Sequence, residues 1–427
     1  MSDKINQGQL FDELLSKEIK ELFYHVNEDP ILNKKRLFFD NAGGSLRLKN
    51  ANNALKETDE LPDCSEHSNH TAKWLLEVQE KAIEDIKIIF NAKSGSVVTS
   101  LTASMVIFEM NRAIIENTPG SNVVTTALEH PSAYDSVVRY ADKTGKEIRV
   151  AKSNPVTGGV DVEEITKLVD KDTCLLSFIY ASNISGAVLD AEAIVRECRK
   201  INPDLYIVVD SVQHTPHGVL DLEKTPVDGI NFAPYKFFGT RGLGIGFMSD
   251  RASKLPHDKL IAKPDEEWEL GSPAPSQFAS ITEIVNYVCW IGSKFIESTD
   301  RRELYAEGMN RINLHERALM YRMLNGSDKA EGLRNIKGVK VYLDYEDLSA
   351  RDLIMAIGFD NIGCIGAVAE YEKRGVITFE RVNSSLYSAR ILNSLGIEGV
   401  VRVSPLHCHD VDDIDEFLKI TKEISEL

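Results

Sequence analysis

A single lysine lies in an aromatic and glycine-rich stretch, residues 232–247, which reads FAPYKFFGTRGLGIGF. Lysine ammonium groups are rarely buried without a partner, and closely spaced glycines let the backbone pass close to a bulky group. One explanation of Lys236 is a surface side chain whose stem lies along apolar groups while its charge stays in water. The other is a desolvated nucleophile that forms a Schiff base with an aldehyde cofactor. Other parts of the chain decide between the two.

The second explanation predicts further residues with defined chemistry. Pyridoxal phosphate needs a carboxylate beside its ring nitrogen, and Asp210 ends the apolar run YIVVD. Three residues later, Gln213 can reach the phenolic oxygen of the cofactor. A phosphate needs the N–H groups of a helix start together with a hydroxyl, which Leu101 and Thr102 supply in TSLTASMVIF. His130, in LEHPSAY, offers a flat side chain for the pyridine face.

Each of these residues also has a structural interpretation. Asp210 can cap the turn that follows it, Thr102 can be a plain helix N-cap, and a lone histidine is more often structural than functional. Only their occurrence together favours a cofactor site.

The elements that must position these residues are apolar runs alternating with helical patterns. The runs SVVTS (96–100), NVVTT (122–126), EIRVA (147–151), CLLSFIY (174–180) and LYIVVD (205–210) are typical of strands. Residues 102–115, 133–145 and 190–201 have helical patterns. This alternation predicts an α/β fold with a mainly parallel sheet covered by helices. Ligands of such sheets bind at the carboxyl ends of the strands, where Thr102, His130, Asn183 and Asp210 fall.

The C-terminal third predicts a second, smaller α/β domain. Residues 290–330 have the pattern of one long charged helix, and the strand-like runs that follow are VKVYLD (339–344), GCIGAVA (363–369), GVITFE (375–380) and VVRVSP (400–405). The N-terminus has the pattern of an amphipathic helix that joins this domain. We expect an N-terminal helix and arm in 1–55, a large cofactor-binding domain in 56–295 and a small domain in 296–427.

Composition restricts the partners. Of 427 residues, 49 are Lys or Arg and 66 are Asp or Glu, so the net charge of −17 argues against binding to nucleic acid or an anionic membrane. No run is long enough for a transmembrane helix, and the N-terminus lacks the basic-then-apolar layout of a signal peptide. The six cysteines are scattered without metal-binding spacing, which suggests a reducing cytoplasm. HCHD at 407–410 places its side chains too close in sequence to converge on one ion. We expect no metal.

Seven motifs in order resemble the class V aminotransferase family of pyridoxal phosphate enzymes, particularly its cysteine-desulfurase-like branch. They are FFDNAGGS (38–45), Thr102, EH (129–130), SNISG (182–186), VDSVQ (209–213), PYKFFG (234–239) and VVRVSPLH (400–407). The resemblance spans nearly the whole chain. It implies a fold-type I enzyme with a seven-stranded, mainly parallel sheet, working as a homodimer with active sites at the subunit interface.

The resemblance also implies a role for each matched residue. Lys236 matches the Schiff-base lysine, Asp210 the partner of the ring nitrogen and Gln213 the partner of the phenolic oxygen. His130 matches the ring-stacking histidine that helps to move protons. The remaining matches are Leu101, Thr102 and Tyr235 at the cofactor, Ala42, Asn183 and Arg402 at the substrate, and Ser272, whose hydroxyl would reach the phosphate of the neighbouring subunit.

Three positions depart from the family pattern. Ala233 stands where many relatives carry a phosphate-binding serine, so Thr102 and Ser272 would carry more of the phosphate. Tyr235 replaces the histidine that desulfurases place before the lysine. Residues 374–388, RGVITFERVNSSLYS, contain no cysteine where desulfurases place their persulfide-forming thiol, and the closest match is near Ser384.

These observations predict an enzyme that acts on a small amino acid through an external aldimine and a quinonoid. A β-eliminating lyase is the first choice because elimination needs no nucleophile beyond Lys236. An aminotransferase is the alternative, followed by an epimerase, a cysteine desulfurase and a non-catalytic pyridoxal-phosphate-binding regulator. Arg241 and Arg381 are expected either to bind a second anionic group of the substrate or to lie solvated on the surface.

Overall fold

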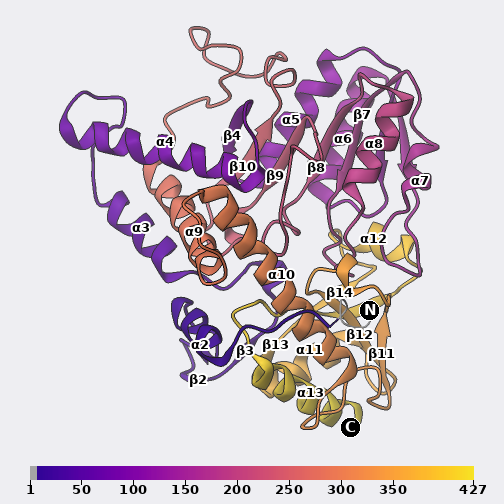
Figure 1. The fold of residues 1–427 in the computed structure, drawn as a ribbon. Helices are drawn as coiled ribbons and strands as arrows, with labels where there is room; N and C mark the ends of the chain where they lie inside the picture. The colour runs from indigo at the N-terminus through magenta and orange to yellow at the C-terminus, as the bar shows by residue number, and fades with distance from the viewer. Residues whose placement is uncertain (1–6) are drawn as a thin grey trace.

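A computed structural model describes residues 7–427 of the chain. Its centre is a seven-stranded sheet of order β4-β10-β9-β8-β7-β5-β6 (Figure 1). Strands β9, β8, β7, β5 and β6 are parallel neighbours, while β10 is antiparallel to both β4 and β9. The strands are β4 (Ser96–Ser100), β5 (Asn122–Thr126), β6 (Glu147–Ala151), β7 (Thr173–Ile179), β8 (Tyr206–Asp210), β9 (Gly229–Phe232) and β10 (Gly244–Met248). The mainly parallel seven-stranded sheet predicted from the sequence is confirmed.

Helices cover both faces of this sheet because its strands are apolar on both sides. In β7, Leu175 packs with α5 (Ala103–Asn117) and α6 (Pro131–Thr144), whereas its neighbour Leu176 packs in the core that contains α8 (Ala191–Ile201) and α4 (His70–Phe90). Consecutive strand residues point to opposite faces, so one run of sequence supplies both cores. The short helix α7 (Val162–Thr166) lies near β5 and β6.

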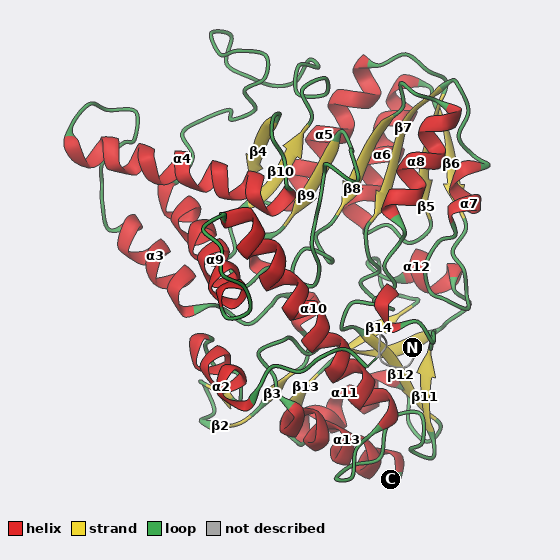
Figure 2. Cartoon of the chain, in the orientation of Figure 1, coloured by secondary structure: helices red, strands yellow, loops and turns green. Residues whose placement is uncertain are grey.

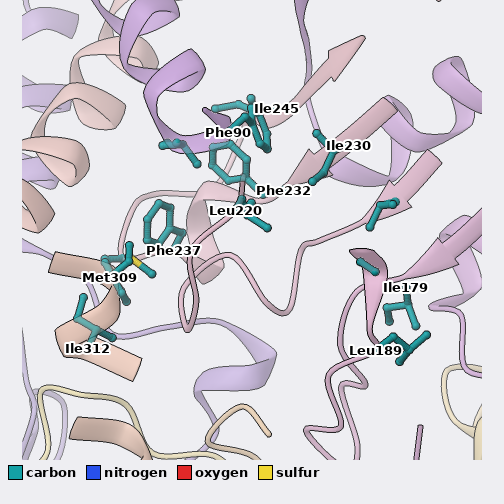
Figure 3. Packing of buried hydrophobic residues seen from close by; sticks show 14 of the residues in the cluster. Phe90, Ile179, Leu189, Leu220, Ile230, Phe232, Phe237, Ile245, Met309 and Ile312 are labelled. Atoms are coloured by element: carbon teal, nitrogen blue, oxygen red, sulfur yellow. The ribbon is translucent and has the colours of Figure 1, made fainter. Parts of the chain in front are cut away.

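Three aromatic side chains form the core beneath the lysine segment. Phe90, Phe232 and Phe237 pack together with Ile245 of β10 (Figure 3). The ring centroids lie 5.6 Å apart between Phe90 and Phe232, and 6.0 Å apart between Phe232 and Phe237. This cluster fixes the backbone on both sides of the short 3-10 helix η2 (Pro234–Lys236), which carries the lysine.

The second sheet has four antiparallel strands in the order β11-β12-β15-β14. Figure 2 labels β11, β12 and β14 of this sheet, below the central sheet in that view. They are β11 (Val339–Tyr342), β12 (Met355–Phe359), β14 (Phe379–Val382) and β15 (Gly399–Val403). Helices α11 (Cys364–Lys373) and α13 (Val411–Ser425) pack with this sheet around one apolar cluster, while α12 (Ala389–Ser394) lies between β14 and β15 in the chain.

The N-terminal segment joins this smaller unit. Strand β3 (Leu37–Phe38) pairs in parallel with β13 (Val376–Ile377), and Lys20 of α2 (Glu13–Leu22) lies 2.7 Å from Asp410. The remaining elements are β1 (Glu28–Asp29), β2 (Lys34–Lys35), η1 (Asn41–Gly43), α3 (Lys49–Asp59) and η3 (Leu348–Ala350). The predicted N-terminal amphipathic helix corresponds to α2.

Two sequence expectations were wrong. Residues 290–330 form parts of two helices, α9 (Pro275–Ser293) and α10 (Arg301–Asn325), because Asp300 caps the second one by accepting a hydrogen bond from the Glu303 N–H. The run GCIGAVA begins helix α11 rather than a strand, and the strand lies earlier, in β12. A short apolar run does not by itself separate a strand from a buried helix.

Helices α9 and α10 cross at two glycines. A Cβ atom built on Gly292 would lie 2.0 Å from the carbonyl oxygen of Leu304, and one built on Gly308 would lie 2.0 Å from that of Val288. The missing side chains allow the backbones to touch, so α10 leaves this crossing at a fixed angle and continues towards α13 (Figure 1). No helix within residues 7–427 is both long enough and apolar enough to cross a bilayer.

Candidate active site

A cavity of about 190 Å³ lies at the carboxyl ends of the central strands. Its walls come from the loops after β4, β5, β7, β8 and β9, and they include seven of the predicted site residues: Thr102, His130, Asn183, Asp210, Gln213, Tyr235 and Lys236. These residues are spread over 135 positions of sequence, and the parallel sheet brings them together at one edge.

Lys236 is buried in this cavity. Burial is the largest cause that lowers the pKa of its ammonium group to about 8, and the positive charge of Arg402 lowers it further, against the opposing effect of Asp210. A buried lysine with a lowered pKa holds more of its amine in the neutral, nucleophilic form at neutral pH.

The backbone after the lysine is held in an uncommon conformation. Phe238 has a φ of 64°, in the left-handed region that favours glycine. Its N–H donates to the Ser45 hydroxyl at 2.9 Å, and its carbonyl accepts from the Leu48 N–H at 2.9 Å. Such strain persists where the surroundings hold it, and here the segment that follows η1 holds the lysine loop.

Asp210 ends β8 below the cavity. Its carboxylate accepts a hydrogen bond from the Val212 N–H at 3.1 Å, and burial raises its pKa while Lys236 opposes that rise. A buried carboxylate is costly without a cation beside it, so this position favours a positively charged ligand group.

His130 is the N-cap of α6. Its Nδ1 accepts a hydrogen bond from the Ser132 N–H at 3.2 Å, which places the proton of the neutral ring on Nε2. Burial and the charge of Lys236 lower its pKa to about 3. His130 is therefore a neutral hydrogen-bond donor near pH 7.

The N-terminus of α5 lies against β10. A Cβ atom on Gly244 would lie 2.1 Å from backbone atoms of Thr102 and Ala103, so only glycine allows this approach. Thr102 caps the helix by accepting from the Met105 N–H at 3.2 Å. Ser104 and Ser132 place their hydroxyls 2.6 Å apart, between the first turns of α5 and α6.

Arg402 lies on β15 and is almost fully buried. Its guanidinium donates to Asp40 Oδ1 at 2.6 Å and to the carbonyl of Asn183 at 3.2 Å, while its Nε has no partner among residues 7–427. Ala42, in η1, is buried, and its N–H donates to the Ser404 hydroxyl at 3.0 Å. The motif FFDNAGGS thus lies directly beside the strand that carries Arg402.

Leu101 and Ser272 do not line the cavity that holds Lys236 in the same chain. Both line a neighbouring cavity of about 400 Å³, where the Ser272 hydroxyl donates to Glu66 of the same chain. The side chain of Leu101 is 68% exposed. The proposal that Ser272 acts on a neighbouring subunit remains a prediction.

The sequence model of the family described as Aminotransferase class-V matches residues 37–417 of this chain. The chain belongs to that family. Members of the class V aminotransferase family use pyridoxal 5′-phosphate, so this protein is a pyridoxal-phosphate-dependent enzyme.

Several relatives in the class V family are named as cysteine desulfurases. A probable cysteine desulfurase of Borreliella burgdorferi is 26% identical over 379 residues, which cover 79% of this chain and 87% of the relative. One of Mycoplasma genitalium is 28% identical over 53% of this chain, an alignment that spans 56% of that relative. The solved apo structure of a cysteine desulfurase from Thermococcus onnurineus NA1 has a TM-score of 0.81 at 17% identity, covering 96% of this chain and 98% of that one. This last likeness shows the shared fold.

The residues of the cavity fit the cofactor of the class V family. The side-chain oxygens of Asn183, Gln213 and Asn231 are buried without a hydrogen-bond partner within residues 7–427, and all three residues line the cavity. Buried polar atoms without partners are rare in proteins, so these atoms indicate a polar ligand. Asp210 meets the need of a protonated ring nitrogen, and the close approach at Gly244 leaves the N–H groups of α5 near the cavity.

Three residues at the site were not singled out from the sequence. Glu129 is fully buried, and its pKa is raised to about 8 by burial, against hydrogen bonds from Thr126 and the Ile179 N–H. It immediately precedes His130, and that position in EH was its only signal. Asp40, the partner of Arg402, lies in the motif FFDNAGGS, and that was its only signal, whereas Asn231 of β9 gave none.

The motif HCHD (407–410), which was considered as a metal site, forms part of the core. His407 Nε2 lies 2.7 Å from the Tyr287 hydroxyl, and His409 Nδ1 accepts from the Leu406 N–H at 3.0 Å. Within residues 7–427, no group of three or more metal-ligating side chains comes together.

Proposed function

We propose that this protein is a β-eliminating lyase that acts on a small amino acid. The observation that carries the proposal is a buried lysine with a pKa near 8, whose charge interacts with Asp210 and Arg402, in a cavity that none of the chain's six cysteines lines. The lysine and the cofactor are sufficient for elimination, whereas persulfide chemistry needs a thiolate at the same place.

Each side chain of the site has a defined task in this reaction. Pyridoxal phosphate, when bound, supplies the electron sink for the pair left by the Cα–H bond. Arg402 binds the substrate carboxylate through its free Nε edge. The neutral amine of Lys236 takes the Cα proton, and its pKa near the working pH suits a general base.

The carboxylate and the histidine act on the cofactor ring. Asp210 holds a proton on the ring nitrogen, because its buried negative charge is stabilised only by a cation. His130 donates its Nε2–H and packs as a flat neutral ring, since its low pKa prevents it from adding another positive charge. Asn183 and Gln213 offer their unpaired amide oxygens to O–H or N–H groups of the cofactor or substrate.

The proposed reaction balances with one water molecule. The Cα–H bond and the bond from Cβ to its substituent break, and the substituent leaves with the bonding electron pair. The remaining three-carbon fragment takes up water and ends as a 2-oxo acid and ammonium, and the substituent leaves in its protonated form. No oxidant or reductant is needed.

A cysteine desulfurase is the second candidate, because relatives of this chain carry that name. It would have to transfer sulfur to a thiol. Cys364, at the start of α11, is half-buried, and its pKa is raised by burial, which disfavours a reactive thiolate. We therefore expect that sulfur released from cysteine would leave as sulfide.

The deciding experiment gives the purified holoenzyme separate amino acids and follows the 2-oxo acid, ammonia, alanine and sulfide. A 2-oxo acid and ammonia in equal amounts support the lyase, and neither product is expected from Lys236→Ala. Alanine together with a persulfide on Cys364 or Cys408 would establish the desulfurase instead. Borohydride reduction and peptide mapping should find the pyridoxyl group on Lys236, and its presence on another lysine would overturn the site.

We further propose that the enzyme is a cytoplasmic homodimer. The face near Leu101 supports the dimer: Leu270, which is also exposed, lines the same neighbouring cavity as Leu101 and Ser272. Exposed apolar side chains gathered in one region often mark an interface between subunits.

A further inference from the structure

Arg381, on β14, is a buried cation without a counter-ion. It is 6% exposed, and it forms no ion pair with any residue in 7–427. Its Nη2 donates to the carbonyl of Tyr387 at 2.8 Å, and its Nε has no partner within the same residues. A buried charge is costly unless it is paired and hydrogen-bonded.

The other buried arginines of this region do not share this feature. Arg402 has Asp40 as its carboxylate partner. Arg351, equally buried and also without an ion pair, donates to three backbone carbonyls, those of Ser185, Thr157 and Leu343. Arg381 has neither a carboxylate partner nor a set of carbonyl partners, so nothing within residues 7–427 compensates the cost of burying its charge.

The strand register places Arg381 on the same face as Arg402. Phe379 of β14 lies opposite Arg402 of β15, and Arg381 is two residues further along β14. Residues opposite each other share a face of an antiparallel sheet, and so do residues two apart on one strand. The positive charge of Arg381 also lowers the pKa of both Lys236 and His130, which line the cavity.

The acidic side chain that acts on Arg381 is already ion-paired with another arginine. Asp40 is the carboxylate that acts on Arg381, and it is bound to Arg402 at 2.6 Å. Asp40 is thus ion-paired with Arg402, and Arg381 has no ion-pair partner of its own within residues 7–427. This corner of the site lacks an anion.

We infer that Arg381 binds an anionic group on the substrate side chain, while Arg402 binds the α-carboxylate. The inference rests on the proposed function, and it names the substrate class: small amino acids whose β-substituent is an anionic leaving group, such as a phosphate ester or a sulfate ester. The planar guanidinium suits such groups because it donates two parallel hydrogen bonds.

Calorimetry with unreactive acids tests the inference on the holoenzyme. Succinate carries two carboxylates, and butyrate has the same carbon chain length with one. We expect the holoenzyme to bind succinate about 10- to 100-fold more tightly than butyrate, the range for a hydrogen bond to a charged group. Arg381→Met should remove this difference while leaving butyrate binding unchanged, and Arg381→Lys should keep part of it.

Two arginines serve as matched controls. Arg241 lines the mouth of the cavity and stacks over Tyr235, with its guanidinium carbon 4.2 Å from the ring centroid, and Arg196 is an exposed residue of α8. Both Arg241→Met and Arg196→Met should keep the preference for succinate. Equal binding of the two acids, or a preference that survives in Arg381→Met or disappears in Arg241→Met, would overturn the inference.

A kinetic arm separates this inference from the proposed function. O-phosphoserine should be converted with a higher kcat/KM than serine, and Arg381→Lys should reduce that ratio. If no amino acid yields a 2-oxo acid, the proposed lyase activity is wrong, but the calorimetric comparison still decides whether Arg381 binds an anion.

Discussion

The reactivity of Lys236 comes from the groups around it. Burial makes its ammonium form costly, Arg402 adds to that cost, and Asp210 keeps part of the positive charge. The same cavity keeps His130 neutral and leaves three amide oxygens without partners among residues 7–427, those of Asn183, Gln213 and Asn231. A cofactor with a phosphate, a ring cation and an aldehyde would satisfy these side chains together.

The pH dependence of aldehyde capture should reveal the lowered pKa of Lys236. Only the neutral amine reacts, so the rate at which the apoprotein binds pyridoxal phosphate should rise with pH and level off above about pH 8. Arg402→Met removes a cation that disfavours the ammonium, so its midpoint should move to higher pH. Stopped-flow absorbance from pH 6 to 10 measures both. A wild-type midpoint near that of free lysine, about 10.4, would contradict the assignment.

Asp210→Ala should lower turnover by about 10²- to 10³-fold, because losing one electrostatic partner of a developing charge has an effect of that size. Steady-state kinetics on the reconstituted variant measures the effect, with circular dichroism to check the fold. Asp204→Ala, in the exposed turn before β8, is the control and should leave turnover unchanged. Wild-type turnover in Asp210→Ala would exclude the ring-nitrogen contact.

At the scale of the elements, the contact between α5 and β10 shapes the phosphate side of the cavity. Gly244→Ala would put a methyl group 2.1 Å from backbone atoms at the start of α5, and backbone cannot move aside as a flexible side chain can. We expect weaker cofactor retention and a lower Tm. Equilibrium dialysis and thermal unfolding measure the two effects.

Gly363→Ala is the matched control for this contact. Gly363 precedes α11, and a Cβ atom there would meet nothing within 4 Å. This variant should retain the cofactor and the Tm of the wild type. If Gly244→Ala behaved in the same way, the close approach would have no role in binding.

The strands of the central sheet could be predicted because their signals are local. SVVTS and NVVTT are β4 and β5 residue for residue, and polar side chains directly after such strands must meet at one edge of a parallel sheet. GCIGAVA was misassigned because its glycines and small apolar residues suit a strand as well as a helix, and nothing local showed that it begins α11.

The electrostatic environment of the site could not be predicted in the same way. The pairing of Asp40 with Arg402 depends on two segments 362 residues apart. Arg381 is unpaired because the folded chain brings no carboxylate within ion-pair distance of it, among residues 7–427. The sequence named both arginines, but only the packed structure distinguishes the one with a partner from the one without.

At the scale of the whole molecule, we predict a homodimer that is needed for full cofactor binding. Ser272 lies on the segment before α9 and lines the same neighbouring cavity as the exposed Leu101, outside the cavity that holds Lys236 in its own chain. Sedimentation should show a dimer, and Ser272→Ala should weaken cofactor retention more than it slows the chemical step. A fully active monomer would contradict this prediction.

The domain boundaries at residues 55 and 295 stay a prediction that limited proteolysis can test.

The pairing of β3 with β13 determines when the active site can form during synthesis. Leu37 and Phe38 are synthesised long before their partners Val376 and Ile377. Until then the nascent chain carries an unpaired strand edge, and Asp40 has no Arg402. Folding that waits for distant partners is slow and exposes the growing chain to aggregation. The active site therefore depends on β13 and β15, and a premature stop before β15 would leave the central sheet without Arg402, the proposed ligand of the substrate carboxylate.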